Sequence, residues 1–175
     1  MRILSITSPD LSNGLGCRLT IWVSGCTHKC PGCHNPHTWN YNIGADLSDT
    51  ETVIEIISSI KEQLDKPYID GVTFSGGDPL DQNDESLQQL LTLIKAIKED
   101  YPNKNIWIYS GDVFEELIKS DIKKQILSYC DVLVDGPFIR EKQQIGLPFR
   151  GSDNQRIIDI TKTIDNKYNV VEVEL

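Results

Sequence analysis

Short apolar runs alternate with longer amphipathic stretches through most of this chain, and this alternation limits its possible folds more than any other feature. The short runs have the length and the β-forming side chains of strands, and they are Leu19–Val23, Gly71–Ser75, Asn105–Tyr109 and Asp131–Val134. Between them, apolar side chains recur every three or four residues, as on one face of a helix. Strands that alternate with helices are usually parallel and joined by crossover helices. The pattern therefore predicts an α/β fold.

Two of the amphipathic stretches carry clear signals for the start or the end of a helix. Ser48 or Asp49 can cap a helix whose last apolar position is Leu64, and Pro67 stops it. A second helix is predicted over about Asp84–Asp100, with leucine and isoleucine side chains on one side.

The rest of the chain gives weaker signals. Asp112 is predicted to cap a third helix, and weaker strand candidates lie at Arg156–Ile160 and Asn169–Val173. Four or five strand–helix units in 175 residues are too few for a closed eight-fold barrel, which typically has about 250 residues. We therefore expect an open partial (β/α) barrel with mostly parallel strands, formed by residues 1–175 as a single domain.

Three loops are predicted to follow parallel strands at their C-terminal ends. They are the cysteine-containing loop after Leu19–Val23, the loop Gly76–Pro79, and the loop Tyr109–Gly111. Ligands of α/β proteins commonly bind at this end of the sheet. We therefore expect the three loops to meet around one site.

The first of these loops contains three of the five cysteines of the chain, in the spacing C-x3-C-x2-C. Cys26, Cys30 and Cys33 can wrap one metal centre, because thiolates bind soft or borderline metals and the spacing is short. If the centre is a 4Fe–4S cubane, three cysteines leave one iron without a protein ligand. An open coordination position is what separates a catalytic metal site from a structural one.

A structural zinc site with three cysteines and one histidine is the main alternative. His28, His34 and His37 are near enough in the sequence to supply the histidine. Zinc sites, however, usually have a second ligand pair well downstream, and here Cys130 stands alone. The spacing favours iron–sulfur but leaves zinc open, and Cys17 and Cys130 are expected to be ordinary core residues.

The loop Gly76-Gly77-Asp78-Pro79 follows the second predicted strand. Two glycines let a ligand approach the backbone closely, and backbone carbonyls with a carboxylate would suit the ammonium group of an amino acid. A plain turn is an equally good interpretation of these four residues alone. The chain contains neither of the common glycine-rich phosphate-binding patterns.

The chain has a formal net charge of −9, which argues against general binding to nucleic acid. Four cations near the C-terminus could meet an anionic partner, although a solvated face is the simpler interpretation: Arg140, Lys142, Arg150 and Arg156. Without an apolar run of about 18 residues or a secretory signal, we expect a cytoplasmic protein that does not cross a membrane.

The C-x3-C-x2-C loop followed by Gly76-Gly77-Asp78-Pro79 resembles the radical S-adenosylmethionine superfamily. The resemblance implies that Cys26, Cys30 and Cys33 hold one 4Fe–4S cluster per chain. The amino and carboxylate groups of S-adenosyl-L-methionine would then chelate the unique iron, and Gly76, Gly77 and Asp78 would contact the amino group. Asp78 stands where glutamate is commoner in that superfamily.

A closer resemblance is to the activating enzymes of the anaerobic (class III) ribonucleoside-triphosphate reductases. The similar stretches span nearly the whole chain: residues 14–18, 23–35, 106–111, 132–138 and 150–156. The residue before the third cysteine is often aromatic in the superfamily, but here, as in these activating enzymes, it is glycine. Adenine contacts are therefore expected from the backbone around Gly32, Cys33 and His34.

This resemblance implies that a small electron-donor protein reduces the cluster, and that the enzyme forms a glycyl radical on the large catalytic subunit of the reductase. The cofactors carry the chemistry, so no catalytic side chain is nominated. Ser110 and Asp135 are candidates for binding the methionine carboxylate or the ribose, and Gly136–Phe138 and Arg150–Arg156 for the partner-facing rim. The alternatives are a radical enzyme acting on a small molecule, similar to a deazaguanine synthase, and a zinc-stabilised interaction module.

Overall fold

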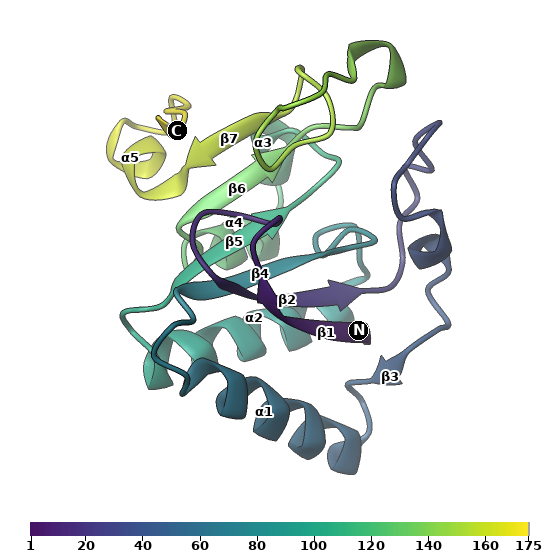
Figure 1. The fold of residues 1–175 in the computed structure, drawn as a ribbon, viewed down its shortest axis with the longest axis vertical. Helices are drawn as coiled ribbons and strands as arrows, with labels where there is room; N and C mark the ends of the chain where they lie inside the picture. The colour runs from purple at the N-terminus through teal and green to yellow at the C-terminus, as the bar shows by residue number, and fades with distance from the viewer. Residues whose placement is uncertain (175) are drawn as a thin grey trace.

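The computed structural model describes residues 1–174 and contains a seven-stranded open sheet with strand order β3-β1-β2-β4-β5-β6-β7 (Figure 1). The strands are β1 (Arg2–Asp10), β2 (Arg18–Val23), β3 (Ala45–Asp46), β4 (Gly71–Gly76), β5 (Asn105–Tyr109), β6 (Val132–Asp135) and β7 (Arg156–Asp159). The α-helices are α1 (Thr50–Leu64), α2 (Asp84–Asp100), α3 (Phe114–Leu117), α4 (Asp121–Leu127) and α5 (Ile160–Asp165). Two short 3-10 helices, η1 (Pro36–Trp39) and η2 (Arg140–Lys142), lie in the longest loops.

The four central strands of the sheet are parallel, and the outer strands are antiparallel to their neighbours. β2, β4, β5 and β6 pair in parallel, whereas β1 pairs antiparallel with β2 and β3, and β7 pairs antiparallel with β6. This confirms the predicted α/β class and the crossover connections. The expectation of mostly parallel strands holds only for the centre of the sheet. The strand order agrees with an open sheet, and the curvature of a partial barrel stays a prediction.

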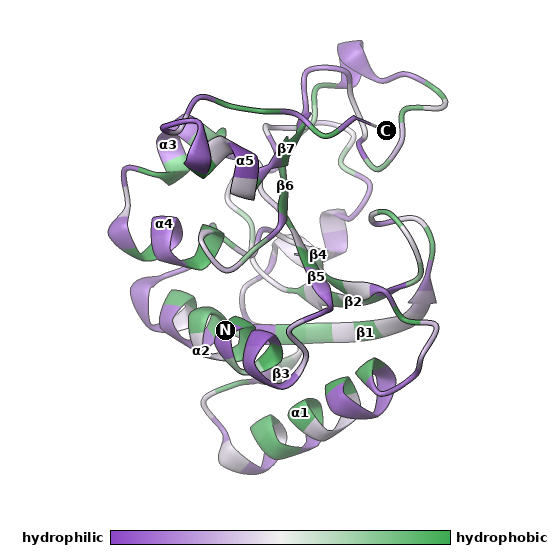
Figure 2. Cartoon of the chain, turned by 90° about the vertical axis from the view of Figure 1, so that its left-hand side faces the viewer, coloured by the Kyte–Doolittle hydropathy of each residue, from purple (hydrophilic) through white to green (hydrophobic). Residues whose placement is uncertain are grey.

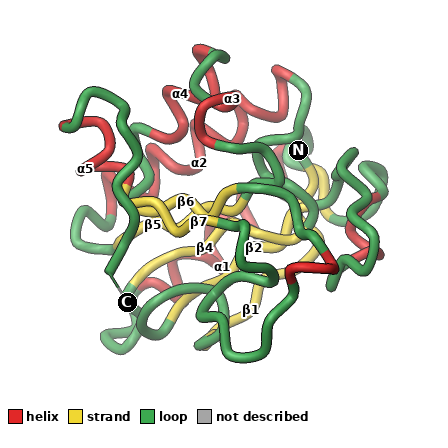
Figure 3. Tube along the Cα trace, turned by 90° about the horizontal axis from the view of Figure 1, so that it is seen from above, coloured by secondary structure: helices red, strands yellow, loops and turns green. Residues whose placement is uncertain are grey.

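Alternate residues of the central strands point to the two faces of the sheet. Leu19, Phe74 and Ile108 belong to the large apolar core that includes side chains of α1, α2 and α4. Trp107 and Val134, which alternate with these positions, form a smaller cluster on the other face. Loops cover that second face, on the side of the sheet away from α2 and α4 (Figures 2 and 3).

Local signals place α1 and α2 where the sequence predicted them. The Asp49 side chain accepts a hydrogen bond from the backbone N–H of Thr52, and Asn83 does the same for Ser86 at the start of α2. Each helix buries one apolar stripe against the sheet, including Leu64 of α1. The predicted bounds of α2 and β5 are confirmed.

Two predictions about the secondary structure were wrong, and one long strand was not predicted. Asp112 does not cap α3, because the carboxylate of Asp135 on β6 accepts the hydrogen bond from the backbone N–H of Phe114 instead. Asn169–Val173 forms no strand and joins the sheet only through an isolated bridge between Ile158 and Glu172. The strand β1, which precedes the first predicted strand, was missed.

A hydrogen-bonded network holds the loop between β1 and β2 over the second face of the sheet. The Asp10 carboxylate accepts hydrogen bonds from Ser12, Asn13 and Thr20. Arg18, which is fully buried, donates to Thr73 Oγ1 and to the backbone oxygen of Val72 among other acceptors. The loop is therefore a fixed wall, and its residues 12 and 13 border the cavity described below.

Asp10→Asn is expected to destabilise the protein in a pH-dependent way. Burial alone would raise the pKa of Asp10, but hydrogen bonds from Thr20, Ser12 and Asn13 outweigh it and hold the pKa below its ordinary value of 3.8. A carboxylate with a lowered pKa stabilises the fold above its unfolded pKa, and this contribution is lost as the pH falls through the folded pKa. The variant should lose about 1–3 kcal/mol of unfolding free energy near neutral pH.

Urea unfolding of both proteins at about pH 7 and about pH 3 measures this effect. The difference between wild type and variant should shrink at the lower pH, because below the ordinary pKa of 3.8 the unfolded wild-type chain binds a proton more readily than the folded protein does. An equal difference at both pH values would show that Asp10 contributes nothing through its charge.

Within residues 1–174, no helix is long and apolar enough to cross a membrane.

Candidate metal and cofactor site

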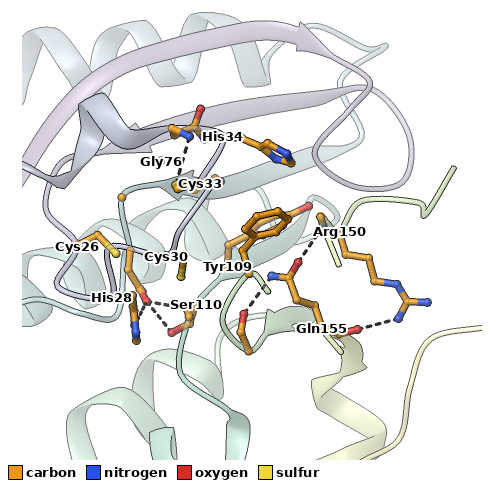
Figure 4. Close-up of a pocket in the computed structure, with 18 of the residues that line it drawn as sticks. Cys26, His28, Cys30, Cys33, His34, Gly76, Tyr109, Ser110, Arg150 and Gln155 are labelled. Carbon is orange, nitrogen blue, oxygen red and sulfur yellow. Dashed lines mark hydrogen bonds and ion pairs between the residues drawn. The ribbon is translucent and has the colours of Figure 1, made fainter. Parts of the chain in front are cut away.

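The three loops expected to converge do meet, around a cavity of about 350 Å³ at the C-terminal ends of the central strands (Figure 4). Cys26, Cys30 and Cys33 line it from the cysteine loop, which follows β2. Residues 75–78 line it from the end of β4, and residues 109–111 from the end of β5. The predicted convergence is confirmed. The cavity also has walls from the β1–β2 loop and from the segment 136–155.

The cysteine loop is built from tight turns. The backbone N–H of Cys33 donates to the carbonyl of Cys30 at 3.0 Å, and Gly32 between them has φ +79. This positive φ is a conformation that favours glycine. The backbone N–H of Asn35 donates to Cys33 Sγ at 3.3 Å. Backbone donors of this kind stabilise a metal-bound thiolate.

Cys26 is buried, whereas Cys30 and Cys33 are half-buried. Burial, reinforced by the nearby Asp78 carboxylate, raises the pKa of the Cys26 thiol to about 11. The free thiol is therefore protonated near neutral pH, and it would release its proton when it binds a metal.

Aspartate and tyrosine side chains hold the start of the cysteine loop. Asp81 accepts hydrogen bonds from both the backbone N–H and the hydroxyl of Thr27, and from the hydroxyl of Tyr41. The ring of Tyr41 packs so closely on Gly25 that a Cβ there would lie 2.1 Å from a ring carbon. Gly25, with φ +101, thus has two reasons to be glycine.

The glycine loop is joined to the cysteine loop along the backbone. The N–H of Gly77 donates to the carbonyl of Val23 at 2.8 Å, and the N–H of Asp78 donates to the carbonyl of Gly25 at 2.8 Å. The imidazole Nε2 of His28 lies 3.1 Å from Asp78 Oδ2. This hydrogen bond to Asp78 raises the pKa of His28 above its ordinary value, although burial opposes the shift.

The segment 136–155 forms a further wall of the cavity. The Tyr109 hydroxyl donates to the carbonyl of Phe149 at 2.7 Å, and the Phe149 ring packs edge-on against Trp107. The ring of Phe138 lies 5.1 Å from that of His34, so the segment contacts the cysteine loop.

The other predicted site residues are divided between the cavity and its surroundings. His34, Gly76, Gly77, Asp78 and Ser110 line the cavity. Gly32 is not among the lining residues, and a Cβ there would lie 3.3 Å from Arg140 Cδ and 3.4 Å from Phe138 Cε1. The predicted adenine contact at Gly32 stays a prediction.

Asp135 and Arg156, two further predicted residues, contact each other away from the cavity lining. The Arg156 guanidinium forms ion pairs with Asp135 and with Glu115. Arg156 is therefore not a free cation of the suggested basic patch. Gly136, Phe138, Arg150 and Gly151 do border the cavity, as expected for a rim.

The chemistry of the lining residues fits an iron–sulfur cluster. Three thiols from one loop face a cavity that is large enough for a further ligand, and backbone N–H groups point at the sulfur atoms of Cys26 and Cys33. In residues 1–174, no group of three or more His, Cys, Asp and Glu side chains is placed to hold a single metal ion. A cubane is a different kind of site, because each thiolate binds its own iron.

Comparison with known proteins agrees with this chemistry. Residues 12–158 match the family model described as a 4Fe-4S single cluster domain. This match includes both the cysteine loop and the glycine loop.

Curated relatives share most of their length with this chain. A protein of Pasteurella multocida is 39% identical over 153 residues, which cover 87% of this chain and 94% of the relative. One from Haemophilus influenzae is 40% identical, covering 90% and 97%. One from Enterobacteria phage T4 is 43% identical over 150 residues, covering 85% and 87%. All three are named anaerobic ribonucleoside-triphosphate reductase-activating protein.

Proposed function

This chain belongs to the family of anaerobic ribonucleoside-triphosphate reductase-activating proteins, and from this we propose that it is the enzyme that activates such a reductase. One structural observation supports the proposal most strongly. Cys26, Cys30 and Cys33 line the same cavity as the glycine loop, so a cluster and a small ligand have room side by side.

The three cysteines would hold a 4Fe–4S cluster with one iron free of protein ligands, and S-adenosyl-L-methionine would complete its coordination. When bound, these cofactors supply reductive cleavage of the sulfonium C–S bond, which yields methionine and a 5′-deoxyadenosyl radical able to remove hydrogen from a glycine Cα of the reductase. The protein binds, orients and shields these groups. We propose no catalytic side chain.

Residues from each wall of the cavity have a role in the proposed binding of the cluster and of S-adenosyl-L-methionine. The backbone N–H of Asn35 favours the thiolate of Cys33. We propose that the backbone of Gly76 and Gly77, which line the cavity, meets the methionine amino group. His34, beside Phe138, offers an aromatic surface for the adenine. Ser110 lines the cavity, but its hydroxyl already donates to Asp78.

A protein substrate requires that a glycine of the partner reach into the cavity. We propose that the large catalytic subunit of the reductase docks over the rim formed by Gly136–Phe138 and Arg150–Arg156, where Gly136, Phe138, Arg150 and Gly151 border the cavity. A small electron-donor protein would reduce the cluster. We also propose that residues 1–175 act as one radical S-adenosylmethionine domain.

Electron paramagnetic resonance tests the choice of partner. After anaerobic reconstitution, reduction and addition of S-adenosyl-L-methionine, a glycyl-radical signal should appear only when the large subunit of the cognate reductase is present. A subunit in which the radical-bearing glycine is replaced by alanine is the matched control and should give no signal.

Two other outcomes would reject the proposal. If reduced enzyme that cleaves S-adenosyl-L-methionine gives no glycyl-radical signal with the subunit, the reductase is not its substrate. Turnover of a small molecule without any protein partner would instead indicate an enzyme similar to a deazaguanine synthase.

A further inference from the structure

Asp78 of the glycine loop is almost fully buried, with 2% of its surface exposed. Its Oδ1 accepts hydrogen bonds from the backbone N–H groups of Leu80 and Asp81, at 2.8 and 3.2 Å. These bonds fix the turn that follows the glycines. The Oδ1 atom therefore accepts its hydrogen bonds from residues that directly follow Asp78 in the chain.

The other oxygen joins two different loops. Asp78 Oδ2 lies 3.1 Å from Nε2 of His28 in the cysteine loop. It also accepts hydrogen bonds from Ser110 Oγ at 3.0 Å and from the backbone N–H of Gly111 at 2.8 Å, both after β5. All three strand-end loops that form the cavity therefore meet at this single atom. Figure 4 shows the interactions of His28 and Ser110 with this carboxylate.

An ionised carboxylate has about four lone-pair sites, and here five donors surround it. Little capacity is left for a ligand ammonium group. A buried charge with all its hydrogen bonds satisfied is instead suited to fixing the groups around it.

We propose that Asp78 and His28 are positioning residues: they form a clasp that holds the cysteine loop against the glycine loop. The methionine amino group then meets the backbone of Gly76 and Gly77 rather than the Asp78 carboxylate. This inference rests on the proposed function for the identity of the ligand, but the clasp itself is a property of the protein alone.

Close packing supports the clasp independently of the hydrogen bonds. A Cβ added to Gly111 would lie 2.5 Å from Cδ2 of the His28 ring. The ring is thus confined between the backbone of the β5 loop and the Asp78 carboxylate. Gly111→Ala should push the His28 ring away from Asp78 although none of the hydrogen-bonding side chains is itself mutated.

Hydrogen–deuterium exchange of the full chain without its cluster tests the clasp. His28→Ala should raise amide exchange in residues 26–33 by about tenfold or more, because a hydrogen bond to a charged group is lost. His28→Gln keeps a donor near the position of Nε2 and should restore most of the protection. His37→Ala is the matched control, since His37 is an exposed histidine on the same stretch of chain.

The second measurement uses the reconstituted enzyme and follows iron loss to a chelator. His28→Ala and Gly111→Ala should each lose iron at least about fivefold faster than wild type. The double variant Asp78→Ala/His28→Ala should lose iron at most about twofold faster than Asp78→Ala alone. Both changes break the same hydrogen-bonded network, so their effects should not add.

Two results would overturn the inference. The first is that His28→Ala and Gly111→Ala both show rates of amide exchange in residues 26–33 and of iron loss within about twofold of the wild-type rates. The other is an Asp78→Ala protein that loses affinity for S-adenosyl-L-methionine but keeps residues 26–33 fully protected, as expected for a direct ligand. The exchange experiment needs no cluster, so failure of the wild-type protein to bind iron would count against the proposed function alone.

Discussion

Cys30→Ala is expected to abolish both cluster retention and cleavage of S-adenosyl-L-methionine. Cys30 lies between Cys26 and Cys33 on one short loop, so its removal leaves two thiolates for a cluster that needs at least three protein ligands here. Iron, acid-labile sulfide and 5′-deoxyadenosine should be measured after anaerobic reconstitution and reduction. All three should fall to background.

Cys130→Ala is the matched control for this change. Cys130 is buried in the main core, where its thiol lies 3.4 Å from the carbonyl of Ile126. The variant should lose some stability, because a buried side chain is truncated, but it should bind iron as wild type does. Full cleavage activity without Cys30, or loss of iron without Cys130, would show that the ligands have been assigned wrongly.

Gly77→Ala is expected to have the second largest effect. A Cβ at this position would lie 2.3 Å from the carbonyl oxygen of Gly25, at the contact between the glycine and cysteine loops. The obstacle is backbone, and the neighbouring hydrogen bonds from Gly77 to Val23 and from Asp78 to Gly25 hold it in place. Overpacking of this kind costs about 1–3 kcal/mol, and here it moves the cysteine loop itself.

The variant should therefore unfold at a lower temperature and bind S-adenosyl-L-methionine at least about tenfold more weakly than wild type. Gly146→Ala provides the comparison. Gly146 has φ +89 but no atom within 4 Å of an added Cβ, so that change introduces backbone strain without a clash. If Gly77→Ala matched Gly146→Ala in both measurements, the close contact of the two loops would not matter for binding.

The parts of the fold that the sequence predicted well are those set by local patterns. The helix α2 begins after Asn83, whose side chain caps it, and buries an apolar stripe that runs from Leu87 to Ile97. The strand β5 is a compact apolar run bounded by polar residues. Such signals lie within a few residues of the elements they determine.

The elements that were missed depend on distant contacts. β1 has an alternating burial pattern with many exposed positions, and its pairing with β2 and β3 makes it a strand. The start of α3 was misplaced because the side chain that accepts its first N–H comes from β6, more than twenty residues later. Asn169–Val173 has the composition of a strand but lies outside the ladder beyond β7.

In the candidate site, too, some features could be predicted from the sequence and others depend on distant contacts. Convergence of the three loops followed from parallel topology, because the C-terminal ends of such strands share one edge of the sheet. The hydrogen-bonding partners of the individual side chains could not be predicted from this topology. From the sequence, His28 was considered only as a possible zinc ligand, and its contact with Asp78, fifty residues away, is visible only in the fold. The wall formed by the segment 136–155 likewise depends on a distant contact, the hydrogen bond from the Tyr109 hydroxyl of β5 to the carbonyl of Phe149.

Anaerobic spectroscopy of the reconstituted protein, with and without S-adenosyl-L-methionine, tests the proposed iron that has no protein ligand. The protein should contain about four irons and about four sulfides per chain, and the paramagnetic resonance of the reduced cluster should change when the sulfonium compound is added. A preparation with one zinc and no sulfide, or a cluster spectrum that stays the same at saturating S-adenosyl-L-methionine, would contradict a three-cysteine cubane with one open iron.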